Sequence, residues 1–266
     1  MKRKRPYSRK RFGQHFLTDT QILDKIIGSI KIADQDHILE IGPGRGDLTN
    51  RLLRLGVPVT GVEIDRDLVA DLEDKYGNHD LFTLLTGDIL KTDWADLIQS
   101  NADNQIVANL PYNISTPFFF KLIEHRNLFH SVTIMVQKEL ALRLCHPGTG
   151  KKLKDYGILS VIAAHTFNVK WIAEVSANSF RPRPKVNSAV IQLTPRPRFM
   201  EEEKVFFGFV RDAFNARRKI FLTHLRKNEP EIFNLLSDAT VQALENLRPE
   251  NLLPGQFLSL YQEQTL

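Results

Sequence analysis

The sequence contains almost no cysteine and no long apolar run. Cys145 is the one cysteine among the 266 residues, which excludes an internal disulfide and a metal site built from cysteines. No apolar run is long enough to cross a bilayer, and the basic N-terminus MKRKRPYSRKR lacks the apolar segment that follows the charges of a signal peptide. We therefore expect a cytoplasmic protein without a membrane-inserted segment.

The composition is otherwise ordinary for a globular protein. Hydrophobic residues make up 42% of the chain and charged residues 25%, as in typical soluble domains. A chain of this length accommodates one large domain, or one domain and a smaller one. The sequence has no internal repeat and no low-complexity tract, and nothing in it indicates more than a monomer.

Two segments of the chain are strongly basic. Residues 1–11 contain seven Lys and Arg and no acid, and residues 181–226 contain eleven basic and four acidic side chains. Because the net charge of the whole chain is only +5, the remainder is net acidic. This distribution favours a polyanion such as nucleic acid bound along one face. The alternative is a disordered basic tail together with a solvated helix face.

Short apolar runs alternate with helix-like segments from His37 onward. Near-continuous apolar strands separated by helices predict a parallel sheet that is covered on both faces, in a doubly wound α/β domain. The predicted strands cover residues 37–42, 57–64, 81–88, 104–112 and 131–136, and the first predicted helices cover residues 47–56 and 66–76.

The second half of the chain has a different pattern. After a predicted helix over 156–167 come two strands, 169–175 and 186–195, joined by SANSFRPRPK. That loop is too short to hold a crossover helix, so we expect the two strands to be antiparallel. The remainder has a helical pattern, and residues 205–225 form the strongest segment, with phenylalanines at helical spacing that indicate core packing.

These patterns predict three parts of the chain. A basic N-terminal tail covers residues 1–11, and an α/β catalytic domain covers residues 12–196. A small helical domain covers residues 197–266, and its basic residues make it the expected RNA-binding part.

A glycine-rich turn, EIGPGRG, follows the first predicted strand and precedes a helix. Gly42, Gly44 and Gly46 let the backbone turn sharply and approach a ligand closely, although a tight turn alone also needs glycine. The dinucleotide fingerprint G-x-G-x-x-G sets a helix N-terminus against a pyrophosphate. Here the spacing is G-x-G-x-G and Asp47 follows, an acid that would repel a phosphate. The turn therefore favours S-adenosylmethionine, which carries an amino-acid moiety and a sulfonium cation.

Polar residues stand at the ends of the next predicted strands. Glu63 ends the second strand, where a carboxylate can accept the hydrogen bonds of a ribose diol. Asp88 ends the third, where it can accept a hydrogen bond from an adenine amine, and Asn109 ends the fourth. Because the carboxyl ends of parallel strands converge on one crevice, we expect these groups to share a pocket, although each alone is compatible with a turn.

The segment VANLPYNISTP indicates chemistry on an amine. The lone pair of an exocyclic adenine amine is delocalised into the ring, so the nitrogen is a poor nucleophile. Hydrogen bonds accepted by the Asn109 side-chain oxygen and the Leu110 carbonyl would localise that lone pair, and Pro111 restricts Leu110. Tyr112 can stack on the base. Such acceptors act by electrostatics and orientation and require no metal.

An aromatic in the Pro-rich loop is a second candidate for base stacking. A paired or stacked base must be splayed out to reach such a pocket, and an aromatic face is then a natural clamp. Phe180 can supply that face beside the basic residues Arg181, Arg183 and Lys185. The alternative for both Phe180 and Tyr112 is a place in the core.

Taken together, the motifs resemble the bacterial small-subunit rRNA adenine dimethyltransferases, the kasugamycin-resistance methylases. The resemblance covers essentially the whole chain, with the motifs in the family's order and spacing. They are RFGQHFL, EIGPGRGDLT, VEID, GD, NLPYNISTP, QKELALRL, FRPRPKVNSAV and VRDAFNARRK.

The resemblance implies a class I, Rossmann-like methyltransferase fold with a C-terminal helical domain. It implies that S-adenosylmethionine supplies four methyl groups to two adjacent adenosines in the 3′-terminal hairpin loop of 16S rRNA, within a maturing small subunit, and leaves as S-adenosylhomocysteine. It also implies that His15 and Leu17 touch the cofactor. Many members of the family carry Asn at the position of His15. The remaining implied sites are cofactor contacts at Gly42, Glu63, Asp88 and Asn109, and base contacts at Asn109, Leu110, Pro111, Tyr112 and Phe180. The glycine-rich turn adds a cofactor contact at Gly44. The basic segments predict RNA contacts at Arg181, Arg183, Lys185, Arg217, Arg218 and Lys219.

Four other functions compete with this interpretation. Macrolide-resistance methylases acting on 23S rRNA are similar, but they typically read N-I-P-Y and lack a proline at the position of Pro117. DNA adenine methyltransferases usually place an acid or a second proline before the tyrosine. A catalytically idle ribosome-assembly factor would not need intact cofactor and NLPY positions. A nicotinamide dehydrogenase is disfavoured by the glycine spacing.

Overall fold

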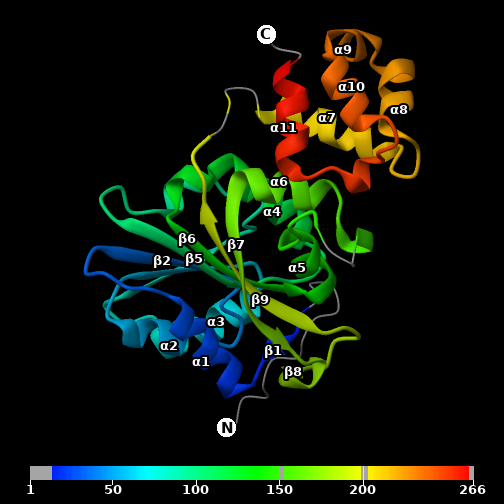
Figure 1. The fold of residues 1–266 in the computed structure, drawn as a ribbon. Helices are drawn as coiled ribbons and strands as arrows, with labels where there is room; N and C mark the ends of the chain where they lie inside the picture. The colour runs from blue at the N-terminus through cyan, green and yellow to red at the C-terminus, as the bar shows by residue number, and fades with distance from the viewer. Residues whose placement is uncertain (1–13, 150–152, 199, 201–202, 264–266) are drawn as a thin grey trace. The chain divides into compact units, whose positions relative to one another are not determined.

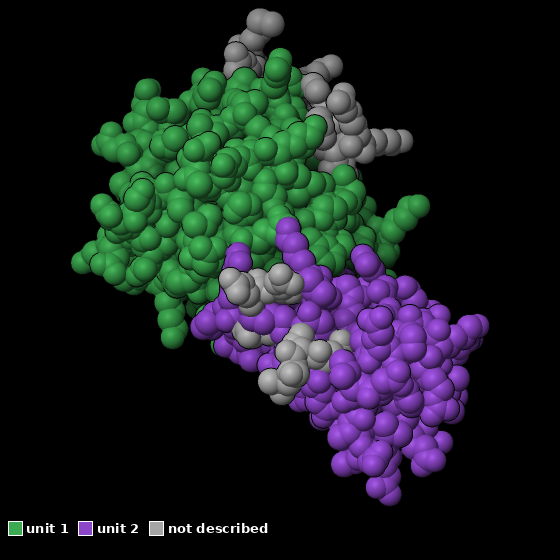
Figure 2. Space-filling model, turned by 90° about the horizontal axis from the view of Figure 1, so that it is seen from above, with its two compact units in different colours: residues 1–141, 170–195 green, residues 142–169, 196–266 purple. Residues whose placement is uncertain are grey.

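The chain folds into two compact units. The computed structural model describes residues 14–149, 153–198, 200 and 203–263, so the predicted basic tail over residues 1–11 lies outside the described residues. Unit 1 comprises residues 1–141 and 170–195, and unit 2 comprises residues 142–169 and 196–266; Figure 2 colours them separately. Each unit has its own apolar core.

The centre of unit 1 is a seven-stranded sheet, seen in Figure 1. Its strand order is β4-β3-β2-β5-β6-β9-β7, and β4, β3, β2, β5 and β6 are parallel to one another. This confirms the predicted doubly wound α/β fold. The strands are β2 (Asp36–Ile41), β3 (Val59–Glu63), β4 (Phe82–Thr86), β5 (Asp103–Asn109), β6 (Ser131–Gln137), β7 (Phe167–Val175) and β9 (Ser188–Pro195).

The central strands are buried because helices cover both faces of the sheet. All six residues of β2 are buried, as expected for a strand in the middle of a parallel sheet. In Figure 1, α1, α2 and α3 lie on one face and α4 on the other. These helices are α1 (Thr20–Ser29), α2 (Thr49–Leu52), α3 (Arg66–Tyr76) and α4 (Ser115–His125), and α5 (Lys138–Leu144) follows β6.

The Pro-rich loop returns the chain to the sheet without a crossover helix. Strand β9 lies between β6 and β7 and runs antiparallel to β6. The loop also contains β8 (Phe180–Arg181), which pairs antiparallel with β1 (Phe16–Leu17) in a two-stranded sheet. This small sheet has no signal in the sequence, because each of its strands has only two residues.

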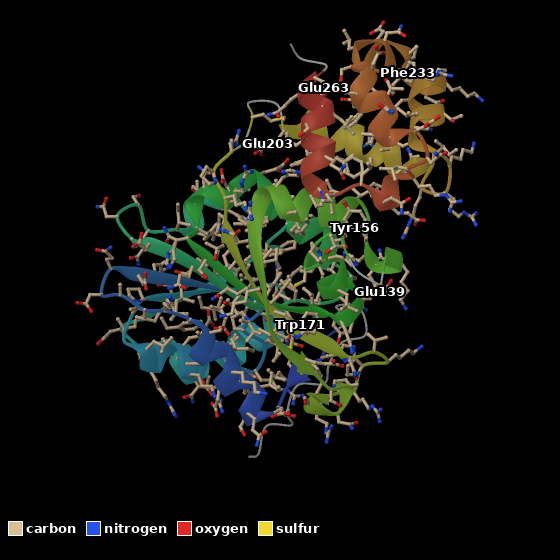
Figure 3. The ribbon with its side chains drawn as sticks, in the orientation of Figure 1. Glu139, Tyr156, Trp171, Glu203, Phe233 and Glu263 are labelled. Carbon is tan, nitrogen blue, oxygen red and sulfur yellow. The ribbon has the colours of Figure 1, made fainter. Side chains whose placement is uncertain are left out.

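Unit 2 is helical around a core of aromatic side chains. Phe206, Phe221 and Phe257 are all fully buried, and the rings of Phe214 and Phe257 stack with centroids 5.5 Å apart. Figure 3 marks Phe233 in this unit; the Arg226 guanidinium lies 4.6 Å from the centroid of its ring. The helices are α6 (Ile158–Thr166), α7 (Glu203–Asn215), α8 (Phe221–Asn228), α9 (Pro230–Leu235), α10 (Asp238–Leu244) and α11 (Pro254–Glu263).

The helical segment predicted over residues 205–225 is divided into two helices by a turn. Helix α7 ends at Asn215 and α8 begins at Phe221. Between them the Lys219 N–H donates to the Ala216 carbonyl at 2.8 Å, closing a turn, and the Phe221 N–H donates to the Leu247 carbonyl at 2.8 Å. The buried position of Phe221 therefore fixes the turn, and the cluster of Arg217, Arg218 and Lys219 lies in it.

No helix among the described residues is both long enough and apolar enough to cross a membrane. This finding concerns the helices of both units.

Tyr156 provides a test of how the core of unit 2 is held together. Its side chain is marked in Figure 3, and its hydroxyl donates a buried hydrogen bond to the Leu252 carbonyl at 2.6 Å. We expect Tyr156→Phe to lower the free energy of unfolding by about 1–2 kcal/mol, because the carbonyl loses its donor in a buried site. Urea denaturation measures the change. Tyr261→Phe, in the same core, is the control, and equal losses for the two variants would contradict the assignment.

Candidate active site

The predicted glycine turn is a tight loop between β2 and α2. Gly42, Gly44 and Gly46 have φ values of 68°, 62° and 81°, in the left-handed region that favours glycine. A Cβ at Gly44 would lie 3.2 Å from the ring of Phe16. The loop therefore requires glycine both for its backbone conformation and for the close approach of β1.

Glu63 fixes this loop to the end of β3. Its carboxylate accepts hydrogen bonds from the Gly44 N–H at one oxygen, and from the Ile64 and Asp65 N–H groups at the other, all at 3.0 Å. Burial raises the pKa of Glu63, and the three backbone donors oppose that shift. Since a carboxylate offers about four acceptor positions, Glu63 retains acceptor capacity for a ligand.

Glu40 is a second buried acid, and the sequence analysis missed it. It precedes the glycine turn in β2 and is 1% exposed. One carboxyl oxygen accepts a hydrogen bond from the Thr49 hydroxyl at 2.7 Å, and the other has no partner among the described residues. Burial raises the pKa of Glu40 to about 8, so it is protonated at neutral pH. The sequence feature that could have identified Glu40 is the presence of an acid inside the apolar run HILEIG.

Asn109 and His15 join the end of β5 to the N-terminal segment. The Asn109 Nδ2 donates to the His15 carbonyl at 3.1 Å, which leaves Oδ1 as the end of the amide that can accept a hydrogen bond. The His15 Nδ1 donates to the Pro182 carbonyl at 2.8 Å. One histidine thus connects Asn109 to the Pro-rich loop.

Tyr112 is held by a serine at the start of β9. The Tyr112 hydroxyl and the Ser188 Oγ are 2.7 Å apart, and Ser188 is completely buried. The ring of Tyr112 lies 5.6 Å from that of His15, with 32° between their planes. The orientation of the tyrosine ring is therefore fixed at one edge, while the ring itself is half-buried.

One cavity of about 240 Å³ brings most of the predicted site residues together. It lies at the carboxyl ends of β2, β3, β4 and β5, as expected for a doubly wound sheet. The predicted residues that line it are His15, Gly42, Gly44, Glu63, Asp88, Asn109, Leu110, Pro111 and Tyr112.

Two of the predicted cofactor and base contacts do not line this cavity. Leu17 and Phe180 are paired with each other across β1 and β8, and both lie in the apolar core of unit 1, 6% and 1% exposed. The contact proposed for Leu17 and the stacking proposed for Phe180 stay predictions. Stacking by Phe180 requires its ring to leave the core.

Other residues line the cavity without having been predicted. Phe16 contributes its ring, over which the Arg45 guanidinium lies at 4.2 Å from the centroid. Gln14 lines the cavity as well and donates to the Asp65 carboxylate at 3.2 Å. The motif QHFL was the available signal, but only the pairing of β1 with β8 brings Phe16 to the glycine loop. The other apolar residues that line the cavity without having been predicted are Ile41, Val62, Ile64, Leu68, Ile89, Leu90 and Ile114.

The predicted RNA-contact residues differ in their environment. Arg181, Arg183 and Lys185 are exposed on the Pro-rich loop of unit 1. In unit 2, Arg218 and Lys219 are exposed. Arg217 is half-buried and forms an ion pair with Glu250, with Nε and Oε2 2.8 Å apart.

No cluster of three His, Cys, Asp or Glu side chains that could hold a metal ion occurs within the part of the chain that the structure describes. The cavity combines a glycine loop with acids at successive strand ends, an arrangement suited to an organic ligand. Fold and site together define a class I, Rossmann-like methyltransferase.

Comparison with known proteins identifies the family. A family model for ribosomal RNA adenine dimethylases matches residues 6–265, and the chain belongs to this family. The ribosomal RNA small subunit methyltransferase A of Pseudomonas aeruginosa is 39% identical over 260 residues, covering 95% of this chain and 93% of the relative. The protein of that name from Clostridium acetobutylicum is 42% identical over 214 residues, covering 79% and 76%.

Solved structures agree with this assignment. A dimethyladenosine transferase from Plasmodium falciparum superposes with a TM-score of 0.78 at 28% identity, covering 95% of this chain and 99% of that one. The 23S rRNA methyltransferase ErmE superposes with a TM-score of 0.72 at 23% identity, covering 94% and 100%. The second likeness shows the shared fold.

The buried Glu40 generates a prediction about pH. Because its pKa rises from 4.5 in the unfolded chain to about 8 in the folded protein, its contribution to stability is complete below pH 4.5 and is lost as the pH rises towards 8. We expect this group to lower the free energy of unfolding by up to about 1.4 kcal/mol per pH unit in that window. In Glu40→Gln this contribution to the pH dependence of the free energy of unfolding should disappear. Urea denaturation of both proteins at several pH values tests it, and parallel pH profiles would contradict it.

Proposed function

We propose that this protein transfers methyl groups from S-adenosylmethionine to the N6 atoms of two adjacent adenosines. We place these in the 3′-terminal hairpin loop of 16S rRNA, in a maturing small ribosomal subunit, with N6,N6-dimethyladenosines as products. The observation that carries the proposal is the single cavity that the glycine loop and Asp88 share with Asn109, Leu110 and Tyr112. Family membership and the names of the bacterial relatives support it.

The glycine-loop side of the cavity fits S-adenosylmethionine. A Cβ at Gly42 would meet no described atom within 4 Å, so the loop leaves open space at this point. Glu63 has spare acceptor capacity for ribose hydroxyls, and Asp88 can accept a hydrogen bond from the adenine amine. S-adenosylmethionine supplies an electrophilic methyl group on a sulfonium. Ile64, Leu68 and Ile89 provide apolar surface for the adenine ring.

The NLPY side of the cavity fits the target base. The Asn109 Oδ1 and the Leu110 carbonyl accept the two N–H groups of the target N6, which localises its lone pair and aims it at the methyl group. As the new N–C bond forms, the S–C bond breaks and the nitrogen becomes cationic, a charge that both oxygens stabilise. The nitrogen then loses a proton to water. Tyr112, fixed through Ser188, stacks on the base and holds it in line.

The basic residues are proposed to bind the rRNA backbone. Arg181, Arg183 and Lys185 extend from the loop that pairs with β1, and the turn between α7 and α8 presents Arg218 and Lys219. Cations that contact phosphates supply affinity without reading sequence. In unit 2, Arg217 is proposed to contribute through both its charge and its ion pair with Glu250.

Asn109→Ala tests the chemistry. We expect kcat for methyl transfer to fall by at least about 10²-fold, because one of two acceptors for the developing charge is removed. Binding of S-adenosylhomocysteine, measured by calorimetry, should largely survive. Asn127→Ala, an exposed asparagine after α4, is the control. A folded Asn109→Ala protein with normal turnover would refute the proposed role.

The double variant Arg218→Gln, Lys219→Gln tests the RNA-binding role of the turn and leaves the Arg217–Glu250 pair intact. The slope of log K against log salt should become shallower by about 0.7–0.9 for each phosphate that the variant no longer neutralises. The control removes the same charge from two exposed lysines of unit 1, Lys31 and Lys91. Filter binding to the rRNA fragment at several salt concentrations measures the slopes, and identical slopes for the two double variants would exclude binding of phosphate by the turn.

A further inference from the structure

Lys121 of α4 points into unit 1 and uses all of its hydrogen-bonding capacity there. Its Nζ donates to the carbonyl oxygens of Ile89 at 3.1 Å, Leu90 at 3.0 Å and Thr92 at 2.6 Å. An ammonium group has three donors and no acceptor, so every proton is engaged by backbone. A lysine on a helix usually extends its charge into water, which makes this inward arrangement a specific feature of the site.

The loop that Lys121 holds forms one wall of the cavity. Asp88, Ile89 and Leu90 all line it. The same loop is supported by Trp94, which is completely buried and whose Nε1 donates to the Ile89 carbonyl at 2.9 Å. The Lys121 Nζ lies 5.5 Å from the centroid of the Trp94 ring. Lys121 and Trp94 therefore hold the loop together.

The helix that carries Lys121 continues from a second segment that lines the cavity. Helix α4 begins at Ser115, directly after the segment NLPYNI, of which Pro111, Tyr112 and Ile114 line the cavity. The Ser115 hydroxyl donates to the Pro111 carbonyl at 3.2 Å, and the Phe118 N–H donates to the Ile114 carbonyl at 2.8 Å. This segment therefore continues into the helix without a flexible joint.

The charges around Lys121 are compatible with an ammonium group. Burial lowers the pKa of Lys121, while the carboxylates of Asp93, Asp88 and Glu124 favour its charged form. Of these acids, Asp88 is the one whose side chain is proposed to accept a hydrogen bond from the cofactor's adenine amine.

We propose that Lys121 is a positioning residue that sets the cofactor wall at residues 88–92 against the target-base wall at residues 109–114. The inference rests on the proposed function, because it assigns the two walls to cofactor and base. Lys121 touches neither ligand; it acts through the three carbonyls. A shift of the 88–92 loop relative to α4 would move the methyl donor away from the amine, and misalignment of this kind is costly for transfer.

Lys121→Met tests the inference, because it keeps an unbranched side chain that is one atom shorter and removes the donors. We expect the Kd for S-adenosylhomocysteine, measured by calorimetry, to rise about tenfold, as loss of charged hydrogen bonds predicts. Hydrogen exchange should increase in peptides covering residues 88–94 and stay unchanged in α1. Lys31→Met is the control, since Lys31 is an exposed lysine of unit 1 that does not line the cavity.

A role in stability alone is distinguishable from positioning. A merely structural lysine would lower the melting temperature of Lys121→Met without changing the Kd of the folded protein or the exchange of the loop. Lys121→Gln, which keeps a donor, replaces the Met variant if that variant does not fold, and it is expected to raise the Kd as well.

Two negative results have different meanings. If the unchanged protein binds S-adenosylhomocysteine and the Lys121 variants bind it equally well, the inference is overturned and the proposed function stands. If the unchanged protein binds no S-adenosylhomocysteine, the proposed function falls and this inference falls with it.

Discussion

The candidate site depends on the alignment of parallel strands. Ile41 in β2 pairs with Val62 on one side and with Ala108 on the other, so β2, β3 and β5 end within a residue or two of one another. The chain leaves each strand at the same edge of the sheet, and the next side chain is available for a ligand. Glu63, Asp88 and Asn109 converge in one cavity for this reason, although dozens of residues separate them in sequence.

A second set of contacts connects other parts of the chain to this edge. The His15 carbonyl accepts a hydrogen bond from the Asn109 amide, and the His15 Nδ1 donates one to the Pro182 carbonyl. The Tyr112 hydroxyl forms a hydrogen bond with the Ser188 Oγ. These bonds connect the N-terminal segment and the Pro-rich loop to the NLPY segment. They orient the Asn109 amide so that its oxygen remains available as an acceptor, which is the feature that the proposed chemistry uses.

The sequence predicted the parts of this arrangement that follow from local pattern. Apolar runs identified the strands of the sheet, and polar residues at their ends identified most of the cavity. Phe16, Glu40 and Lys121 escaped prediction because their roles depend on partners elsewhere in the chain: Gly44, Thr49 and the 89–92 carbonyls. The break between α7 and α8 was missed for the same reason, since the distant Leu247 carbonyl fixes it.

The most direct test of the account is to identify the product and its place. The full chain is incubated with S-adenosylmethionine and unmethylated small subunits, with naked 23S rRNA in parallel, and N6,N6-dimethyladenosine is quantified by mass spectrometry after digestion. The account predicts dimethyladenosine at two adjacent positions in the 3′-terminal hairpin of 16S rRNA and none in 23S rRNA. Product in 23S rRNA alone, or no product in either RNA while S-adenosylhomocysteine still binds, would contradict it.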